Sequence, residues 1–229
     1  MKLDILYLDN HLLVVNKPAG LLAQGDATGD PTVLTLGKAY LKETFDKPGR
    51  VYLGLVHRLD RPASGVMVLA RTSKAAQRLT DQFRNRSPEK RYMAIVEGLC
   101  QGSGSCEDYL VKERRQVRVV PASYPQAKRA AMTWQTVATR RDGLSLLDIR
   151  LETGRSHQIR IQLSHRGWPL LGDIRYGAGR ELDGRNLALH AYRLTIEHPT
   201  RRESMTWQAV PPPNWRSLFD EAIAQVLTA

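Results

Sequence analysis

Two alternating stretches in the second half of the chain constrain the fold most strongly. AMTWQTVATR and GLSLLDIRLETG alternate between apolar and polar residues over much of their length, which is typical of half-buried strands. They are joined through Arg141-Asp142-Gly143, and an Asp-Gly pair between two such stretches indicates a β-hairpin. The sequence therefore predicts a sheet with much antiparallel pairing.

Further short apolar stretches predict additional strands, bounded by Gly, Pro and Asp residues. The predicted strands are the two halves of LDILYLDNHLLVVNK around a turn at Asp9-Asn10, then 51–57, 65–71, 90–98, 114–120, 187–199 and 203–213. The GSGS stretch from Gly102 to Ser105 is predicted to be a turn or a short link, and 121–130 to be a loop.

The clearest predicted helix covers 72–90, where apolar residues recur at helical spacing. Thr72 or Ser73 can cap its start, and Pro88 follows its end. The other predicted helices are 32–45, 156–167, which Gly167 would end, and 214–227. Because no repeat, low-complexity tract or break in composition divides the chain, we predict one α+β domain over residues 1–229 with a mixed, largely antiparallel sheet.

The positive charge of the chain is the first property that indicates a partner. Lys and Arg number 34 against 23 Asp and Glu, which gives a net charge of +11 and a pI near 9.9. Basic proteins often bind polyanions, because Lys and Arg displace counterions from phosphates, and a basic surface without a specific partner is the alternative. The cations are spread along the chain, so we expect a broad basic face.

Other features narrow the class of protein. No apolar run is long enough for a membrane span, and Asp4 and Asp9 interrupt what would be a signal core, so we expect a cytoplasmic protein. Cys100 and Cys106 lack the further ligands of a zinc site and are predicted to be free thiols. The sequence also lacks a Gly-rich phosphate loop, a dinucleotide-binding Gly triplet and a nucleophile elbow.

One carboxylate in a cationic setting is the strongest candidate for chemistry. The stretch HRLDRPASGV sets Asp60 among His57, Arg58 and Arg61, in the connection between two predicted strands. Nearby positive charge favours the ionised carboxylate, which can act as a nucleophile or a base, and the same cations would repel a metal ion. A structural ion pair with an arginine is the alternative.

A second stretch, TGRSHQIRIQ, combines a predicted helix start with two arginines. Ser156 can cap the helix, which would place Arg155 and unbonded backbone N–H groups at its positive end as a phosphate cradle. Arg160 on the same helix needs an acid partner, for which Asp60 is a candidate. A solvated basic face is the alternative. On a predicted strand, Tyr92 suits either stacking on a nucleobase or simple packing.

Taken in order along the chain, these motifs resemble those of the RluA-type family of RNA pseudouridine synthases. The matching stretches are VVNKPAGLL, HRLDRPASGV, KRYMAIV, TGRSHQIR and LALHAYRLTIEHP, and the resemblance runs from about Ile5 to Pro211. The resemblance implies a catalytic domain of the pseudouridine synthase type with a central cleft. It also implies that a uridine of RNA is flipped out and isomerised to pseudouridine, without a metal or an organic cofactor.

The resemblance also implies roles for individual residues. Asp60 matches the catalytic aspartate, and Arg58 matches the arginine that fills the gap left by the flipped uridine. Tyr92 matches the active-site tyrosine near the uracil, Ile159 a packing residue of the pocket, and Arg160 the arginine that pairs with the aspartate. Whether the aspartate attacks C1′, adds to C6 or removes a sugar proton stays open.

The expected partner is an RNA, either a tRNA or an rRNA, and we expect no DNA, no membrane and a monomer. Several family members carry a small RNA-binding domain ahead of the catalytic one. Here the first predicted strand begins within a few residues of Met1, so we predict no separate N-terminal RNA-binding domain. This slightly favours a tRNA or a small stem-loop as substrate. The alternatives are an RNA-binding protein or chaperone that kept the fold without the chemistry, and a metal-dependent nuclease or phosphoesterase.

Overall fold

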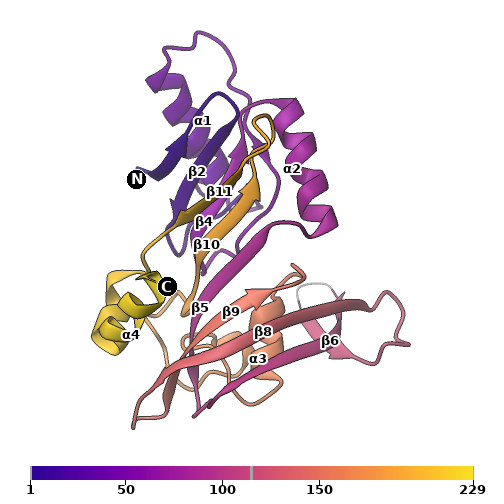
Figure 1. Ribbon diagram of the computed structural model, residues 1–229, viewed down its shortest axis with the longest axis vertical. Coiled ribbons are helices and arrows are strands. Elements are labelled where there is room, and N and C mark those ends of the chain that lie inside the picture. Colours follow the sequence, from indigo (N-terminus) through magenta and orange to yellow (C-terminus); the bar gives the residue numbers. More distant parts are fainter. Residues whose placement is uncertain (1, 114–115, 229) are drawn as a thin grey trace. The chain divides into compact units, whose positions relative to one another are not determined.

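A computed structural model of the chain describes residues 2–113 and 116–228, which divide into two compact units. The first unit contains the residues up to Glu89 together with Tyr192–Ala209, and the second contains Lys90–Ala191 together with the residues from Val210 onward. Both units combine helices with a largely antiparallel sheet, which confirms the predicted α+β class (Figure 1). The assignment of 1–229 to a single domain stays a prediction.

The strands of the first unit form hairpins. They are β1 (Asp4–Leu8), β2 (Leu12–Lys17), β3 (Gly54–Leu55), β4 (Ser64–Ala70), β10 (Leu189–Glu197), which enters from the second unit, and β11 (Ser204–Gln208). β1 pairs antiparallel with β2, and β2 with β4, which also pairs with β3. β10 and β11 form a second antiparallel pair. The predicted turn at Asp9-Asn10 and the two strands beside it are therefore confirmed.

Two helices of the first unit begin at threonine caps. Thr32 caps α1 (Val33–Thr44), and Thr72 caps α2 (Ser73–Asn85) by accepting a hydrogen bond from the Ala75 N–H at 3.2 Å. The predicted cap at Thr72 is confirmed. α2 ends at Asn85, and the next residue, Arg86, has a left-handed backbone (φ 61°) that stops the helix before Pro88.

An apolar core joins these elements of the first unit. α2 contributes Ala75 and Leu79, which pack with buried residues of the strands. The strand residues of this core are Leu12, Val14, Val66, Val68, Ala70, Leu194, Ile196 and Trp207. Burial of such side chains supplies most of the stability of a domain, so this core sets the position of every loop that leaves β4 and α2.

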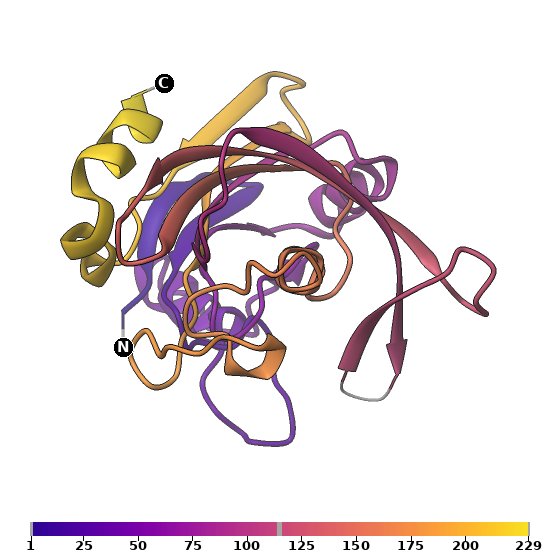
Figure 2. The same cartoon turned by 90° about the horizontal axis from the view of Figure 1, so that it is seen from below.

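The second unit is built on five antiparallel strands in the order β5-β9-β8-β6-β7. They are β5 (Glu89–Glu97), β6 (Ser103–Glu113), β7 (Gln116–Val120), β8 (Lys128–Thr139) and β9 (Leu144–Leu151). β6 and β8 run side by side as long ribbons (Figure 2). The predicted hairpin around Arg141-Asp142-Gly143 is confirmed as β8 and β9.

Two strand predictions are corrected. The predicted turn at Gly102–Ser105 is wrong beyond its first residue, because β6 begins at Ser103. Gly104 lies opposite Trp134, and a Cβ at Gly104 would approach the indole to 2.8 Å, so this glycine makes room for a ring and does not mark a loop. Of the predicted strand 51–57, only Gly54–Leu55 pairs. In the predicted strand 114–120, Arg114 and Arg115 lie outside the described residues.

The remaining helices lie in the second unit. They are α3 (Gln158–Ser164), the short 3₁₀ helices Ile174–Tyr176 and Pro213–Trp215, and α4 (Arg216–Thr228). α3 is shorter than predicted and is not capped by Ser156, because the residue before it is His157 with a left-handed backbone (φ 53°) and no side-chain cap. Over the described ranges, every helix is too short or too polar to cross a membrane.

Candidate active site

Asp60 lies in the connection between β3 and β4 of the first unit, as the sequence predicts. Its carbonyl accepts a hydrogen bond from the Ala63 N–H at 3.1 Å, so Asp60 begins a tight turn. The Asp60 side chain is half-buried, whereas the Arg58 side chain is exposed. The connection thus carries a half-buried carboxylate and, two residues earlier, an exposed cation, on a loop held between two strands.

His57 fastens the start of this loop. Its Nε2 accepts a hydrogen bond from the Val68 N–H of β4 at 3.0 Å. The imidazole also stacks on the ring of Phe83 in α2, with 4.5 Å between the ring centroids and 14° between the planes. His57 therefore anchors the loop to a strand and a helix of the core.

Arg61 ties the same loop to the segment that follows β2. Its Nε–H donates to the Gly20 carbonyl at 3.1 Å, and its Nη2–H donates to Asp30 at 2.6 Å. In return, the Arg61 carbonyl accepts from the Gly20 N–H at 2.8 Å. Arg61, the cation beside Asp60, thus holds two loops together.

Lys17 is a fully buried cation at the centre of this arrangement. Its Nζ donates to the carbonyls of Pro18 at 3.0 Å, Leu21 at 2.7 Å and Arg61 at 3.1 Å, and the side chain has no exposed surface. Burial lowers the pKa of Lys17 to about 7, while the negative charge of Asp60 acts to raise it and Arg61 to lower it further. The buried Lys17 side chain of the NKPAG stretch thus holds the main chain at Arg61, next to Asp60.

Arg160 is held by a carboxylate that sequence reasoning did not identify. Its Nε–H and Nη2–H donate to the two oxygens of Asp173 at 2.7 and 2.8 Å, and the two side chains are only 6% and 2% exposed. Such a side-on pair fixes the plane of the guanidinium. The pairing of Arg160 with Asp60 stays a prediction, since the two residues belong to different units.

A tyrosine and a histidine support the same guanidinium. The Tyr176 ring lies with its centroid 4.9 Å from Cζ of Arg160, and its hydroxyl is 2.7 Å from Nδ1 of His157. Burial raises the pKa of Tyr176 above its ordinary value, although the Val117 N–H and Arg160 act to lower it. His157 has a left-handed backbone, and its side chain contacts Tyr176 instead of capping the helix.

The other predicted residues of the second unit lie on α3 and β5. Ile159 is buried in α3 with 3% exposure, which is compatible with a packing role. Tyr92 lies on β5 opposite Ile149 of β9, and its side chain is half-buried. The structure therefore brings Ile159 and Arg160 together on one short helix and places Tyr92 on a strand of the same unit.

The predicted phosphate cradle at the start of α3 is not formed as expected. The Arg155 N–H donates to Oε1 of Gln158 at 3.0 Å, and the Arg155 Nε–H donates to the Arg129 carbonyl at 3.0 Å. Arg155 instead lines a hollow of about 300 Å³ together with Lys112 and Lys128. The floor of this hollow is formed by apolar residues of β6 and β7. Its cations lie on strands and in a loop, and the start of a helix does not contribute to its positive charge.

Comparison with known proteins identifies the family. A family model described as RNA pseudouridylate synthase matches residues 11–165. The chain is 33% identical over 227 residues to the uncharacterized RNA pseudouridine synthase YlyB of Bacillus subtilis, covering 96% of this chain and 73% of that protein. It is 35% identical over 233 residues to the ribosomal large subunit pseudouridine synthase D of Yersinia pestis, covering 95% and 70%.

A solved structure shows the same fold. The structure titled Human RNA Pseudouridylate Synthase Domain Containing 4 superposes with a TM-score of 0.78 at 24% identity, covering 94% of this chain and 92% of that one. The chain therefore belongs to the RNA pseudouridylate synthase family, of the RluA type that its motifs resemble. It is an RNA pseudouridine synthase, an isomerase.

Proposed function

We propose that this enzyme acts in the cytoplasm, as a monomer, on specific uridines of an rRNA or tRNA, with Asp60 as its catalytic residue. The observation that carries the assignment of Asp60 is its position in the HRLD motif, on a loop whose main chain is fastened by Lys17, His57 and Arg61. A reacting carboxylate must be held within a small distance of its target, and a fastened loop supplies this. The catalytic domain is proposed to extend over residues 1–229.

The reaction requires bond exchange without a net change of oxidation state. The N1–C1′ bond of the uridine breaks, the detached uracil turns, and a C5–C1′ bond forms. The hydrogen on C5 leaves as a proton and N1 takes up a proton, so the product is an isomer of the substrate. An ionised Asp60 can attack C1′, add to C6 or remove a sugar proton. Each route begins with a nucleotide that has been extruded from the RNA, because a stacked base hides these atoms.

The remaining residues are proposed to hold the target. Arg58 fills the space that the flipped uridine leaves, Tyr92 stacks near the uracil and Ile159 packs beside it. Arg160, whose guanidinium is oriented by Asp173, pairs with the catalytic carboxylate. Arg155, with Lys112 and Lys128, offers a cationic hollow for a phosphate of the RNA. These roles rest on the motif match together with the local contacts of each residue.

The identity of the relatives supports an rRNA as the first substrate to test. Proteins named ribosomal large subunit pseudouridine synthase D, from Yersinia pestis and Pseudomonas aeruginosa, are 35% and 34% identical to this chain over more than nine tenths of its length. A tRNA is the second candidate, because a single basic domain is sufficient to bind a compact RNA.

Release of tritium from RNA labelled at C5 of uridine tests the proposal. Formation of the C5–C1′ bond expels this hydrogen, whereas strand cleavage does not. We expect release from a large-subunit rRNA transcript, with tRNA transcripts assayed in parallel. If the protein binds both RNAs but releases no tritium from either, the proposed substrates are wrong, and the chain behaves as an RNA-binding protein that kept the fold.

A further inference from the structure

A hollow of the first unit carries cations that the catalytic motifs do not use. It has a volume of about 700 Å³ and lies between α1 and the segment 48–52. Its charged and aromatic lining residues are Lys38, Lys42, Arg50 and Tyr52. We call this cavity the α1 hollow. No carboxylate is found among the described residues that line it.

The positive charge of the α1 hollow is not neutralised by the protein. Within 2–113 and 116–228, Lys38, Lys42 and Arg50 form no ion pair, whereas exposed Arg84 pairs with Asp81 at 3.1 Å. Lys38 and Lys42 are four residues apart and therefore neighbours on one face of α1, where like charges repel. An anion bound between them would reduce this repulsion, so the charge of the hollow favours the binding of an anion.

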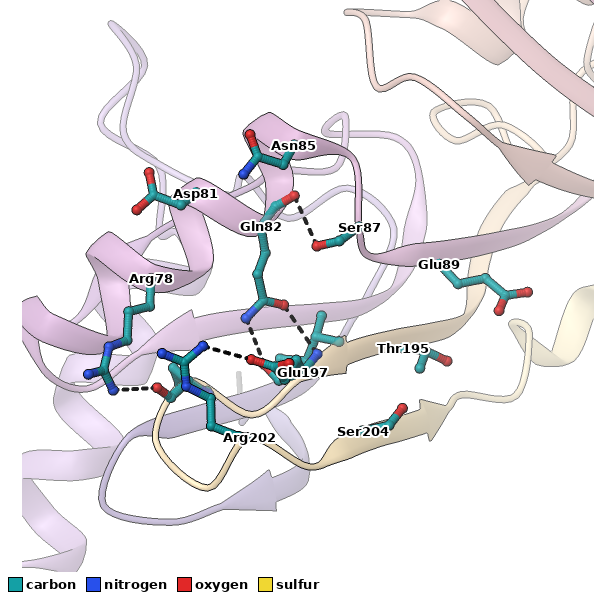
Figure 3. A pocket seen from close by; sticks show the side chains of 12 residues that line it. Arg78, Asp81, Gln82, Asn85, Ser87, Glu89, Thr195, Glu197, Arg202 and Ser204 are labelled. Carbon is teal, nitrogen blue, oxygen red and sulfur yellow. Dashed lines mark hydrogen bonds and ion pairs between the residues drawn. The ribbon is translucent and has the colours of Figure 1, made fainter.

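A larger hollow of the same unit shows the contrast. Figure 3 shows it between α2 and the β10–β11 turn, with both acids and bases on its walls. Arg202 pairs with Glu197 at 3.0 Å, and Arg78 donates to the Pro199 carbonyl at 2.6 Å. Its arginines are thus occupied by the protein itself, and Asp81 also lines its wall. This hollow has no excess of positive charge for a polyanion to meet.

Tyr52 adds an aromatic surface that is held in place. Its side chain is 49% exposed, which is unusual for a large aromatic residue. A Cβ on Gly54 would lie 2.9 Å from the Tyr52 hydroxyl oxygen and 3.1 Å from Cβ of Ala76, so the bare glycine lets the hydroxyl end of the ring lie between β3 and α2. A residue that is 49% exposed and whose ring is held at its hydroxyl end is suited to stacking on a base.

We propose that the α1 hollow binds a nucleotide of the substrate RNA other than the target uridine. Its base stacks on Tyr52, and its flanking phosphates are bound by Lys38, Lys42 and Arg50. The combination of an aromatic ring with unneutralised cations is the chemistry that binds single-stranded nucleic acid with little regard to sequence. This inference rests on the proposed function, because the ligand is the RNA that the enzyme modifies.

Two variants test the two halves of the proposed site in the full chain. Binding is measured by fluorescence anisotropy with the same rRNA and tRNA transcripts, over a series of salt concentrations. Lys38→Ala with Lys42→Ala should weaken binding about tenfold or more and lower the slope of log affinity against log salt by about 1.5. Tyr52→Ala should weaken binding about fivefold to a hundredfold with an unchanged slope.

Matched controls separate a site from general charge. Lys74→Ala with Arg84→Ala removes the same charge from exposed positions of α2 in the same unit and should change the affinity less than twofold. Tyr52→Phe keeps the ring and should bind as wild type. If the α2 variant weakens binding as much as the α1 variant, or if Tyr52→Ala binds as wild type, the α1 hollow is not a nucleotide site. Thermal unfolding verifies that each variant is folded.

Tritium release by the same variants distinguishes the two proposals. For an active wild type, the α1 hollow variants should raise KM about tenfold and change kcat less than twofold. An active wild type whose hollow variants keep both affinity and KM would overturn this inference and leave the proposed function intact. Weaker binding by the hollow variants of a protein that releases no tritium would support the site and contradict the proposed function.

Discussion

The loop that carries Asp60 and the helix that carries Arg160 are held in different ways. In the first unit, hydrogen bonds hold the main chain of the loop, because the Arg61 carbonyl accepts from both Lys17 and Gly20. In the second unit they fasten the functional side chain itself, because Asp173 binds two N–H groups of the guanidinium. The position of a loop and the orientation of a side chain are thus secured by separate buried charges, and single variants can remove one without the other.

The largest effect on stability is expected when the carboxylate that pairs with Arg160 is neutralised. Asp173→Asn breaks a buried ion pair, which costs about 3–5 kcal/mol of unfolding free energy, as urea denaturation would measure. The fraction that remains folded should turn over RNA at least about a hundredfold more slowly, because about 3 kcal/mol of positioning corresponds to that factor. RNA affinity should change little, since phosphate contacts dominate it.

A partly buried ion pair near the end of α3 provides the control for this prediction. Arg166, just after the helix, pairs with Asp108 at 2.8 Å, and the side chains are 26% and 11% exposed. Asp108→Asn should destabilise the unit, while the turnover of its folded fraction stays within about threefold of wild type. An equal loss of turnover in both variants would mean that Asp173 supports the helix in general and not the guanidinium of Arg160.

A smaller effect, dependent on pH, is expected at Lys17. Lys17→Met leaves three carbonyls without their donor and should lower the unfolding free energy by about 2 kcal/mol at pH 7. The pKa of Lys17 is about 7 in the folded protein, below its ordinary 10.5. Between these values the unfolded chain binds a proton that the folded chain does not, so the stability of wild type rises with pH across this window.

The comparison of wild type with Lys17→Met isolates this titration, because all other groups are shared. The difference in unfolding free energy should grow by up to about 1.4 kcal/mol per pH unit between pH 7 and pH 10. Amide hydrogen exchange of residues 57–63 should also accelerate in the variant, while residues 158–164 exchange as in wild type. Parallel stability curves would contradict the lowered pKa, and unchanged exchange would contradict the anchoring of the loop.

The smallest effect is expected at the exposed clamp of the same loop. The side chains of Arg61 and Asp30 are 46% and 43% exposed, so water and salt screen their attraction. Asp30→Asn should therefore lower the unfolding free energy by about 1 kcal/mol or less, and by less still at 1 M salt. If Asp30→Asn lowers the unfolding free energy as much as Lys17→Met does, the exposed Arg61–Asp30 pair stabilises the first unit as much as the buried Lys17, and the account is wrong.

Local features of the chain were predictable from the sequence. The cap at Thr72 and the hairpin through Asp142 and Gly143 depend on neighbours within a few residues, and both are confirmed. The thiols of Cys100 and Cys106 are free as predicted, and burial raises the pKa of each.

Features that depend on distant contacts were not predictable. Gly104 was predicted to lie in a turn, but it lies in a strand, where its lack of a side chain makes room for Trp134. Ser156 was predicted to cap a helix, but the residue before the helix is His157, which contacts Tyr176. Asp173 follows Arg160 by 13 residues, a separation at which no helical or strand periodicity links two side chains. The charge of Lys17 was visible in the sequence, but its contact with the carbonyl of Arg61, 44 residues further along, depends on tertiary structure.

The most direct test of the account is the single-turnover release of tritium by Asp60→Ala on the RNA that wild type modifies. The account predicts a loss of at least about a thousandfold, which corresponds to about 4 kcal/mol, with RNA affinity within a few-fold of wild type. Asp30→Asn, which alters a carboxylate that clamps the same loop, should keep nearly full turnover. Release by Asp60→Ala at a rate close to that of wild type would contradict the central role of this carboxylate.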